Sequence, residues 1–205
     1  MDLKVSEINA RNVFKYETGN RLCLLCIDAL DFYNEDGPDP RLKIRLCNFD
    51  KTRARGDRIT SEVDAFLPVG QFLVLANDVL TGRLSAMKKA REKAGGAIDK
   101  TPYFERYGAR TDASGTPISR QFRIIDGLGN ASFALVGAEN YGYIDDHGQT
   151  RPLSGKSQIA SVFINFPDEK LKELCLVGKM YIEQFAGLLL KEQLEIVRAQ
   201  RENKS

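Results

Sequence analysis

Tryptophan is absent from this 205-residue sequence, and histidine occurs once. A Ser-His-Asp triad or a zinc site built on histidines would therefore depend on His147, which lies in a turn-like segment rich in Asp and Gly. A glycine-rich phosphate-binding loop of the Walker type is also missing. These absences predict a protein that is not an enzyme and that holds no cofactor or metal.

Long apolar runs are lacking as well. No stretch approaches the roughly 18–20 apolar residues that a membrane span needs. The N-terminus has no basic region followed by an apolar run, which is the pattern of a secretory signal. We therefore expect a soluble cytoplasmic protein that has no membrane partner.

Cysteine is scarce, but two of the four cysteines have a spacing that merits a test. Cys23 and Cys26 form a C-x-x-C pair inside an apolar run at 22–27 that is typical of a buried strand. Residues three apart on a strand point to opposite faces, so the two thiols are not expected to converge on a metal. The pattern favours core packing over redox or metal chemistry.

Strand-like segments fill the first third of the sequence. Val, Ile, Phe, Tyr and Cys are enriched in them, and turn residues separate them. We predict strands at about 12–18, 21–33, 41–50 and 58–66. After Pro68 the apolar period changes to that of a helix, which we expect to continue until Gly95-Gly96.

The same order of elements then occurs a second time. Strand-like segments fall at about 103–110, 118–126, 131–144 and 157–166, and a helical pattern follows Pro167 over about 168–198. The order predicts an α+β fold with antiparallel sheets. We expect one domain over 1–205, made of a first unit at 10–96 and a second at 101–198.

The junctions between sheet and helix support an internal duplication. Ile59, Ser61 and Phe66 recur 100 residues later as Ile159, Ser161 and Phe166. A matching proline follows in each half. Together with the repeated order of elements, this favours two copies of one strand-strand-strand-strand-helix unit. The alternative is a single α+β domain whose halves resemble each other by chance.

Positive charge is concentrated in one short stretch. From 41 to 58 there are seven basic residues against two acidic ones, so this stretch carries +5 while the whole chain carries +2. Alternation along 41–46 places Arg41, Lys43 and Arg45 on one face of a strand and apolar residues on the other. Like charges on one face repel unless an anion offsets them, which points to an anionic partner.

Aromatic residues accompany basic ones in both halves. Cations follow the phosphates of a nucleic acid, while aromatic rings stack on unpaired bases, so this mixture suits single-stranded DNA or RNA. About half of these aromatics are expected to belong to the core instead. The candidate nucleic-acid-binding residues are Lys15, Tyr16, Arg41, Lys43, Arg45, Lys51, Arg53, Arg55, Arg58, Arg106, Tyr107, Arg110 and Arg123.

Four strands and then a helix, twice in one chain, resemble the Whirly family of single-stranded DNA-binding proteins and the related positive-cofactor type of transcription coactivator. The resemblance covers about 10–195 and concerns the order of elements. It implies two curved antiparallel sheets packed around a central helix pair, and largely sequence-independent binding of a single strand. It also implies a homo-oligomer as one option, assembled through the C-terminal helix.

Two other functions stay open. The first is a protein-interaction or scaffold module of the same fold, in which the basic strand is only a solvated surface. The second is an enzyme that uses carboxylates such as Asp28, Asp31, Asp126 or Asp145. That chemistry would require two carboxylates to converge in one pocket.

Overall fold

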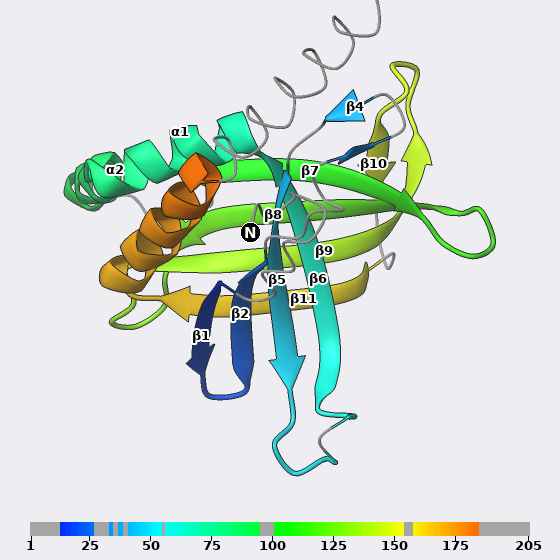
Figure 1. Cartoon of the computed structure of the whole chain (residues 1–205), viewed down its shortest axis with the longest axis horizontal. Helices are drawn as coiled ribbons and strands as arrows, with labels where there is room; N and C mark the ends of the chain where they lie inside the picture. Colours follow the sequence, from blue (N-terminus) through cyan, green and yellow to red (C-terminus); the bar gives the residue numbers. More distant parts are fainter. Residues whose placement is uncertain are drawn as a thin grey trace, which may run out of the picture.

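The computed structural model describes residues 13–26, 33–34, 37–38, 41–54, 56–94, 101–153 and 158–184. Two larger antiparallel sheets and three helices lie within these residues, so the fold is α+β, as the sequence predicts. Figure 1 shows the strands of one sheet running across the strands of the other, with the helices together at one end.

The first sheet contains four strands in the order β1-β2-β5-β6. A positive φ at Gly19 forms the tight turn between the first two strands. The strand predicted at about 21–33 ends earlier, at Cys26, and residues 33–34 pair with 37–38 in a separate two-stranded ladder that the sequence did not predict. The strands are β1 (Phe14–Thr18), β2 (Arg21–Cys26), β3 (Tyr33–Asn34), β4 (Gly37–Pro38), β5 (Arg41–Phe49) and β6 (Ile59–Pro68).

The second sheet contains five strands. Neighbours follow the order β7-β8-β9, and the far edge of β9 pairs with β11 along most of its length and with the short β10 at its end. Strand β10 lies where only a turn was expected. The strands are β7 (Phe104–Thr111), β8 (Pro117–Asp126), β9 (Phe133–Ile144), β10 (Thr150–Pro152) and β11 (Gln158–Phe166).

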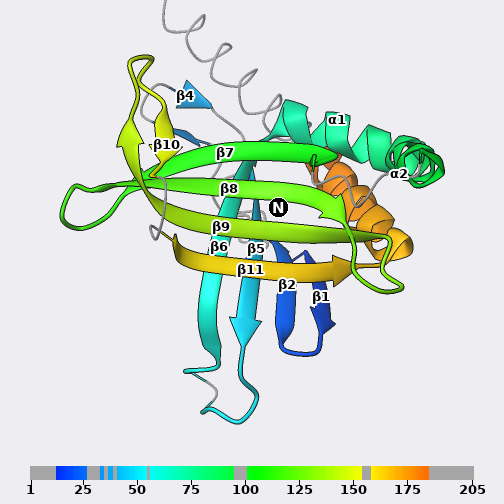
Figure 2. The same cartoon turned by 180° about the vertical axis from the view of Figure 1, so that it is seen from behind.

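The core lies between the crossed sheets, which Figure 2 shows from behind. Alternate residues of each strand are buried, as period-two patterning requires. The sheets approach closely at Gly137 on β9, where an added Cβ would lie 2.9 Å from the Cβ of Val63 on β6. A glycine at this crossing lets the two backbones come together.

The helix after β6 is interrupted. The sequence predicted one helix up to Gly95, but the structure has α1 (Val69–Leu80) and α2 (Arg83–Lys93). Gly82 takes a left-handed conformation with φ of 77°, which ends one helix and begins the other. The prediction of one unbroken helix was wrong because the apolar period continues through this break. Gly95-Gly96 lies outside the described residues.

A third helix follows β11 and is described over 168–184. Its buried Gly178 lies directly against the ring of Phe72 on α1 and within 3.1 Å, measured from an added Cβ, of Leu25 on β2. The two helices therefore pack closely beside the first sheet. The predicted continuation of this helix to 198 lies outside the described residues. None of the described helices is both long enough and apolar enough to traverse a bilayer.

The C-x-x-C pair lies on β2 with its thiols on opposite faces. Cys23 pairs with the buried Leu46 and faces the core, whereas Cys26 pairs with Lys43 on the other face of β5. The geometric prediction for this pair is confirmed. Burial also raises the pKa of the Cys47 thiol to about 12, so this thiol is protonated at neutral pH.

Candidate nucleic-acid interface

Strand β5 has the two faces that alternation predicts. Leu42, Ile44 and Leu46 are buried, while the three basic residues lie on the opposite face. Arg41 is exposed, and Lys43 and Arg45 are half-buried.

The charge of Arg45 is offset within the chain itself. Its Nε and Nη2 donate to the two carboxylate oxygens of Asp64 at 2.7 and 2.8 Å, and Glu62 lies 3.7 Å away. Both acids belong to the neighbouring strand β6, where Asp64 is directly opposite Arg45. The hydrogen bonds to Asp64 raise the pKa of the Arg45 guanidinium. Arg45 therefore joins two strands, and an external anion is not needed to balance it.

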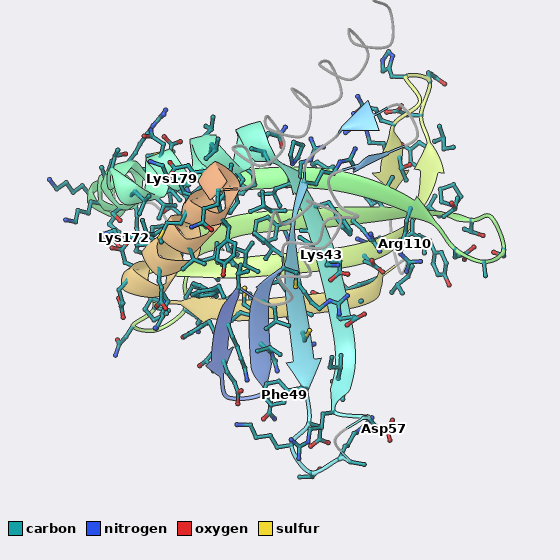
Figure 3. The ribbon with its side chains drawn as sticks, in the orientation of Figure 1. Lys43, Phe49, Asp57, Arg110, Lys172 and Lys179 are labelled. Carbon is teal, nitrogen blue, oxygen red and sulfur yellow. The ribbon has the colours of Figure 1, made fainter. Side chains whose placement is uncertain are left out.

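The basic stretch 41–58 is divided between the two ends of the β5–β6 hairpin. Arg41 pairs with Pro68 at one end, and Phe49 pairs with Ile59 at the other. At about 3.3 Å per residue, a nine-residue strand separates these ends by roughly 25–30 Å. Figure 3 shows Phe49 and Asp57 at the hairpin tip, and Lys43 farther along the strand. These residues are therefore two basic regions rather than one.

The hairpin tip carries cations that have acidic or backbone partners. Lys51 Nζ lies 2.8 Å from Glu17, and Arg53 lies 3.5 Å from Asp50. Arg58 Nε donates to the backbone carbonyl of Arg53 at 3.3 Å. Arg55 lies outside the described residues.

The two candidates on β1 have partners as well. Lys15 is exposed and lies 3.3 Å from Glu17. The half-buried ring of Tyr16 meets Phe166 edge to face, with ring centroids 4.5 Å apart. This packing uses the ring in the core, so the structure does not present Tyr16 as a free stacking platform.

The candidates in the second half do not share one face of their sheet. On β7, Arg106 and Arg110 lie on one face and Tyr107 lies on the other. The register of β7 with β8 places Arg123 on the same face as Tyr107. Arg110 lies 2.9 Å from the buried Glu139. Among the described strands, β7 is an edge strand of this sheet.

The second sheet extends past β6, to the right of β6 in Figure 1, and residues of β5, β6, β7 and β8 together line a groove. We call it the β6–β7 groove. It encloses about 70 Å³. Its lining residues are Arg41, Asp64, Ala65, Phe66, Arg106, Tyr107, Gly108, Ala109, Arg120, Gln121 and Phe122.

Two positively charged side chains lie near the aromatic ring of Phe66, which lines this groove. Lys43 Nζ and Arg120 Cζ lie 5.8 and 5.9 Å from the ring centroid of Phe66. The Nε of Arg106 is buried and has no hydrogen-bond partner in the described part of the chain. Gly108 leaves bare backbone opposite Arg120, because an added Cβ would meet only the Cβ of Arg120, at 3.8 Å. The groove thus combines positively charged side chains, an aromatic ring and the bare backbone of Gly108.

Sequence reasoning omitted Phe66 and Arg120 from the candidate set. A usable signal was present for Arg120, because it shares a face with Phe122 and Ile124, which are core residues. A cation on a core face implies a buried acid nearby. That acid is Glu139, whose carboxylate accepts from Arg120 Nε at 2.6 Å.

Glu139 holds the arginines beside the groove in place, and it is only 5% exposed. Burial raises the pKa of its carboxyl, but the hydrogen bonds from Arg110 and Arg120 outweigh burial and leave that pKa below its usual value. Because the pKa of Glu139 is lower in the folded than in the unfolded protein, its ionised carboxylate stabilises the fold at pH values above the unfolded pKa of about 4.3. This stabilisation is lost as the pH falls through the folded pKa.

Glu139→Gln is therefore expected to lower the free energy of unfolding by about 2 kcal/mol at pH 7, because two arginines lose their anion. The difference from the unsubstituted protein should shrink as the pH falls below the unfolded pKa of about 4.3 and through the lowered folded pKa of Glu139, because the carboxyl then becomes protonated. Urea unfolding of both proteins at pH 7 and pH 3.5 measures this. An equal difference at both pH values would show that the ion pairs do not stabilise the fold.

The two carboxylates of the catalytic alternative that the structure describes, Asp126 and Asp145, lie far apart. Asp126 accepts from Tyr103 Oη at 2.6 Å and from Lys88 Nζ at 3.3 Å, which ties α2 to the second sheet. Asp145 accepts from Arg151 Nε at 2.9 Å. Asp126 pairs with the first residue of β9 and Asp145 follows the last one, so twelve residues, or roughly 40 Å, separate them. Asp28 and Asp31 lie outside the described residues.

No protein-family model matches the chain, and neither does any curated protein or solved structure. The resemblance to the Whirly family therefore continues to depend on the order of elements.

Proposed function

We propose that the chain binds single-stranded nucleic acid in the β6–β7 groove, largely through its backbone. The observation that carries this proposal is the ring of Phe66 with Lys43 and Arg120 near it, together with an Arg106 whose Nε lacks a partner in the described residues. A phosphate would pair with Arg106, and an unpaired base would stack on the ring of Phe66. A duplex keeps its bases stacked on one another, so it would use only the charges.

The arrangement of elements supports the proposed relation to the Whirly fold. Each larger sheet is followed by helix, and α1 contacts the helix at 168–184 through Phe72 and Gly178. We propose that the chain is one domain built from two duplicated units, 10–96 and 101–198, whose helices form the central pair of that fold. Assembly into a homo-oligomer through the last helix is a further part of this proposal. The cytoplasm is the proposed location.

A binding titration tests the function. A fluorescent single strand of about 30 nucleotides is expected to bind more tightly than the matching duplex, and to lose affinity steeply between 50 and 200 mM salt. Arg106→Gln should weaken binding about fivefold to tenfold and reduce the salt slope by about one, because it removes one phosphate contact. Its Nε has no hydrogen-bond partner in the described residues, so the fold should tolerate the change.

Lys179→Gln is the matched control, because it removes one positive charge from the helix at 168–184, and Figure 3 shows Lys179 well away from Lys43 and Arg110. If both variants lost affinity equally, the effect would come from the overall charge of the protein, and the proposal that the groove is the binding site would be wrong. Absence of binding at 50 mM salt would contradict the proposed function itself.

A protein-interaction module is the second candidate. Exposed apolar side chains near the end of β9 favour it: Tyr141, Tyr143 and Ile144 are 45, 49 and 63% exposed. Surfaces of this composition often contact other proteins. If no nucleic acid bound in the titration, these exposed side chains would become the candidate site for a partner protein.

A further inference from the structure

A larger cavity lies along β7, next to the β6–β7 groove. It has a volume of about 630 Å³. Four residues, 106–109, line both spaces, so the two adjoin one another along this strand. We call it the β7 cavity. The residues that line it alone are Gln71 at the start of α1, Phe104, Glu105, and Gly148, Gln149, Thr150 and Arg151 of the β9–β10 hairpin.

The chemistry of the β7 cavity differs from that of the groove. The charged groups that line this cavity alone are engaged: Glu105 accepts from Gln121 Nε2 at 2.6 Å, and Arg151 Nε donates to Asp145 at 2.9 Å. The amides of Gln71 and Gln149 have no side-chain hydrogen bond in the described residues. Neutral polar side chains thus remain for a ligand, where the groove offers cations.

An amide side chain presents a donor and an acceptor side by side, which is also how the hydrogen-bonding edge of a nucleobase is arranged. Side-chain amides therefore distinguish bases, whereas cations bound to phosphates do not. The cavity volume falls within the roughly 300–1,000 Å³ that is usual for small-ligand sites, and it exceeds what one base requires.

We infer that the β7 cavity takes one unstacked base of the bound strand and selects among bases through Gln71 and Gln149. This inference rests on the proposed function, because the arginines of the groove would hold the neighbouring phosphates. It departs from the expectation of binding that is largely independent of sequence. The groove supplies affinity for any strand, and the cavity adds a preference at one nucleotide position.

Anisotropy titrations with about 20-nucleotide dT, dC and dA homopolymers test the inference. The unsubstituted protein should prefer one of them at least fivefold over the weakest. The double variant Gln71→Ala, Gln149→Ala should bring the three affinities within twofold of one another, with the weakest one unchanged. Both glutamines are exposed, so the fold should tolerate their loss.

Gln158→Ala is the control, because Gln158 is an exposed glutamine on β11 that does not line the cavity. It should leave the preference as it is. Equal binding of all three homopolymers by the unsubstituted protein would overturn the inference and leave the proposed function standing. A preference that survives in the double variant would also overturn it, since intrinsic stacking differences between the homopolymers would then be its source. No binding of any homopolymer would overturn both.

Discussion

Gly178→Val is expected to lower the free energy of unfolding by about 3 kcal/mol, because overpacking a tight core costs about 1–3 kcal/mol or more. A Cβ at this position would overlap the ring of Phe72, a fully buried residue, and press on Leu25. Replacing a helical glycine normally stabilises a helix by at most about 1 kcal/mol, so the clash outweighs that gain. Urea unfolding followed by circular dichroism measures the change.

Gly70→Ala is the matched control for this prediction. Gly70 is also a helical glycine, but it is exposed and an added Cβ would meet no atom within 4 Å. Its replacement should leave stability unchanged or raise it by a few tenths of a kcal/mol, because it lies in the first turn of α1. A Gly178→Val protein as stable as the parent would mean that α1 and the helix at 168–184 do not touch. The proposed central helix pair would then be lost as well.

Periodicity along the sequence predicted most of what is local in this fold. Alternation identified the buried face of β5, and helical spacing identified Phe72, Leu75 and Val79 as the buried stripe of α1. These patterns are strong because burial of each side chain depends on its direction from its own backbone. The break at Gly82 was missed, since Leu84 continues the apolar spacing across it.

The candidate site was harder to predict because its geometry depends on which strands become neighbours. The acid that neutralises Arg45 is 19 residues away and reaches it only through the register of β5 with β6. Charge reversal at Arg45 would therefore crowd three carboxylates and damage the fold, so this residue is a poor probe of binding. The approach of Phe66 to Arg120 joins two different sheets, and no spacing within the sequence encodes it.

Replacing one aromatic ring at a time shows which of the two basic regions of the β5–β6 hairpin binds nucleic acid. Phe66→Ala is expected to weaken single-strand binding about tenfold, because a stacked base contributes roughly 1–3 kcal/mol. Phe49→Ala should change the affinity by less than twofold. The comparison is matched, since both rings are half-buried and each has a lysine nearby, at 5.8 Å for Phe66 and 5.4 Å for Phe49.

What distinguishes the two rings is the state of the surrounding charges. Around Phe49, the cations Lys51 and Arg53 already have carboxylate partners, so a phosphate would have to displace Glu17 or Asp50. Around Phe66, Arg120 also has a carboxylate partner, Glu139, but the Nε of Arg106 has no hydrogen-bond partner in the described residues, so a phosphate there would displace no acid. A tenfold loss of affinity in the Phe49 variant, with unchanged affinity in the Phe66 variant, would place the bound nucleic acid at the hairpin tip. The β6–β7 groove and the β7 cavity beside it would then need a different ligand.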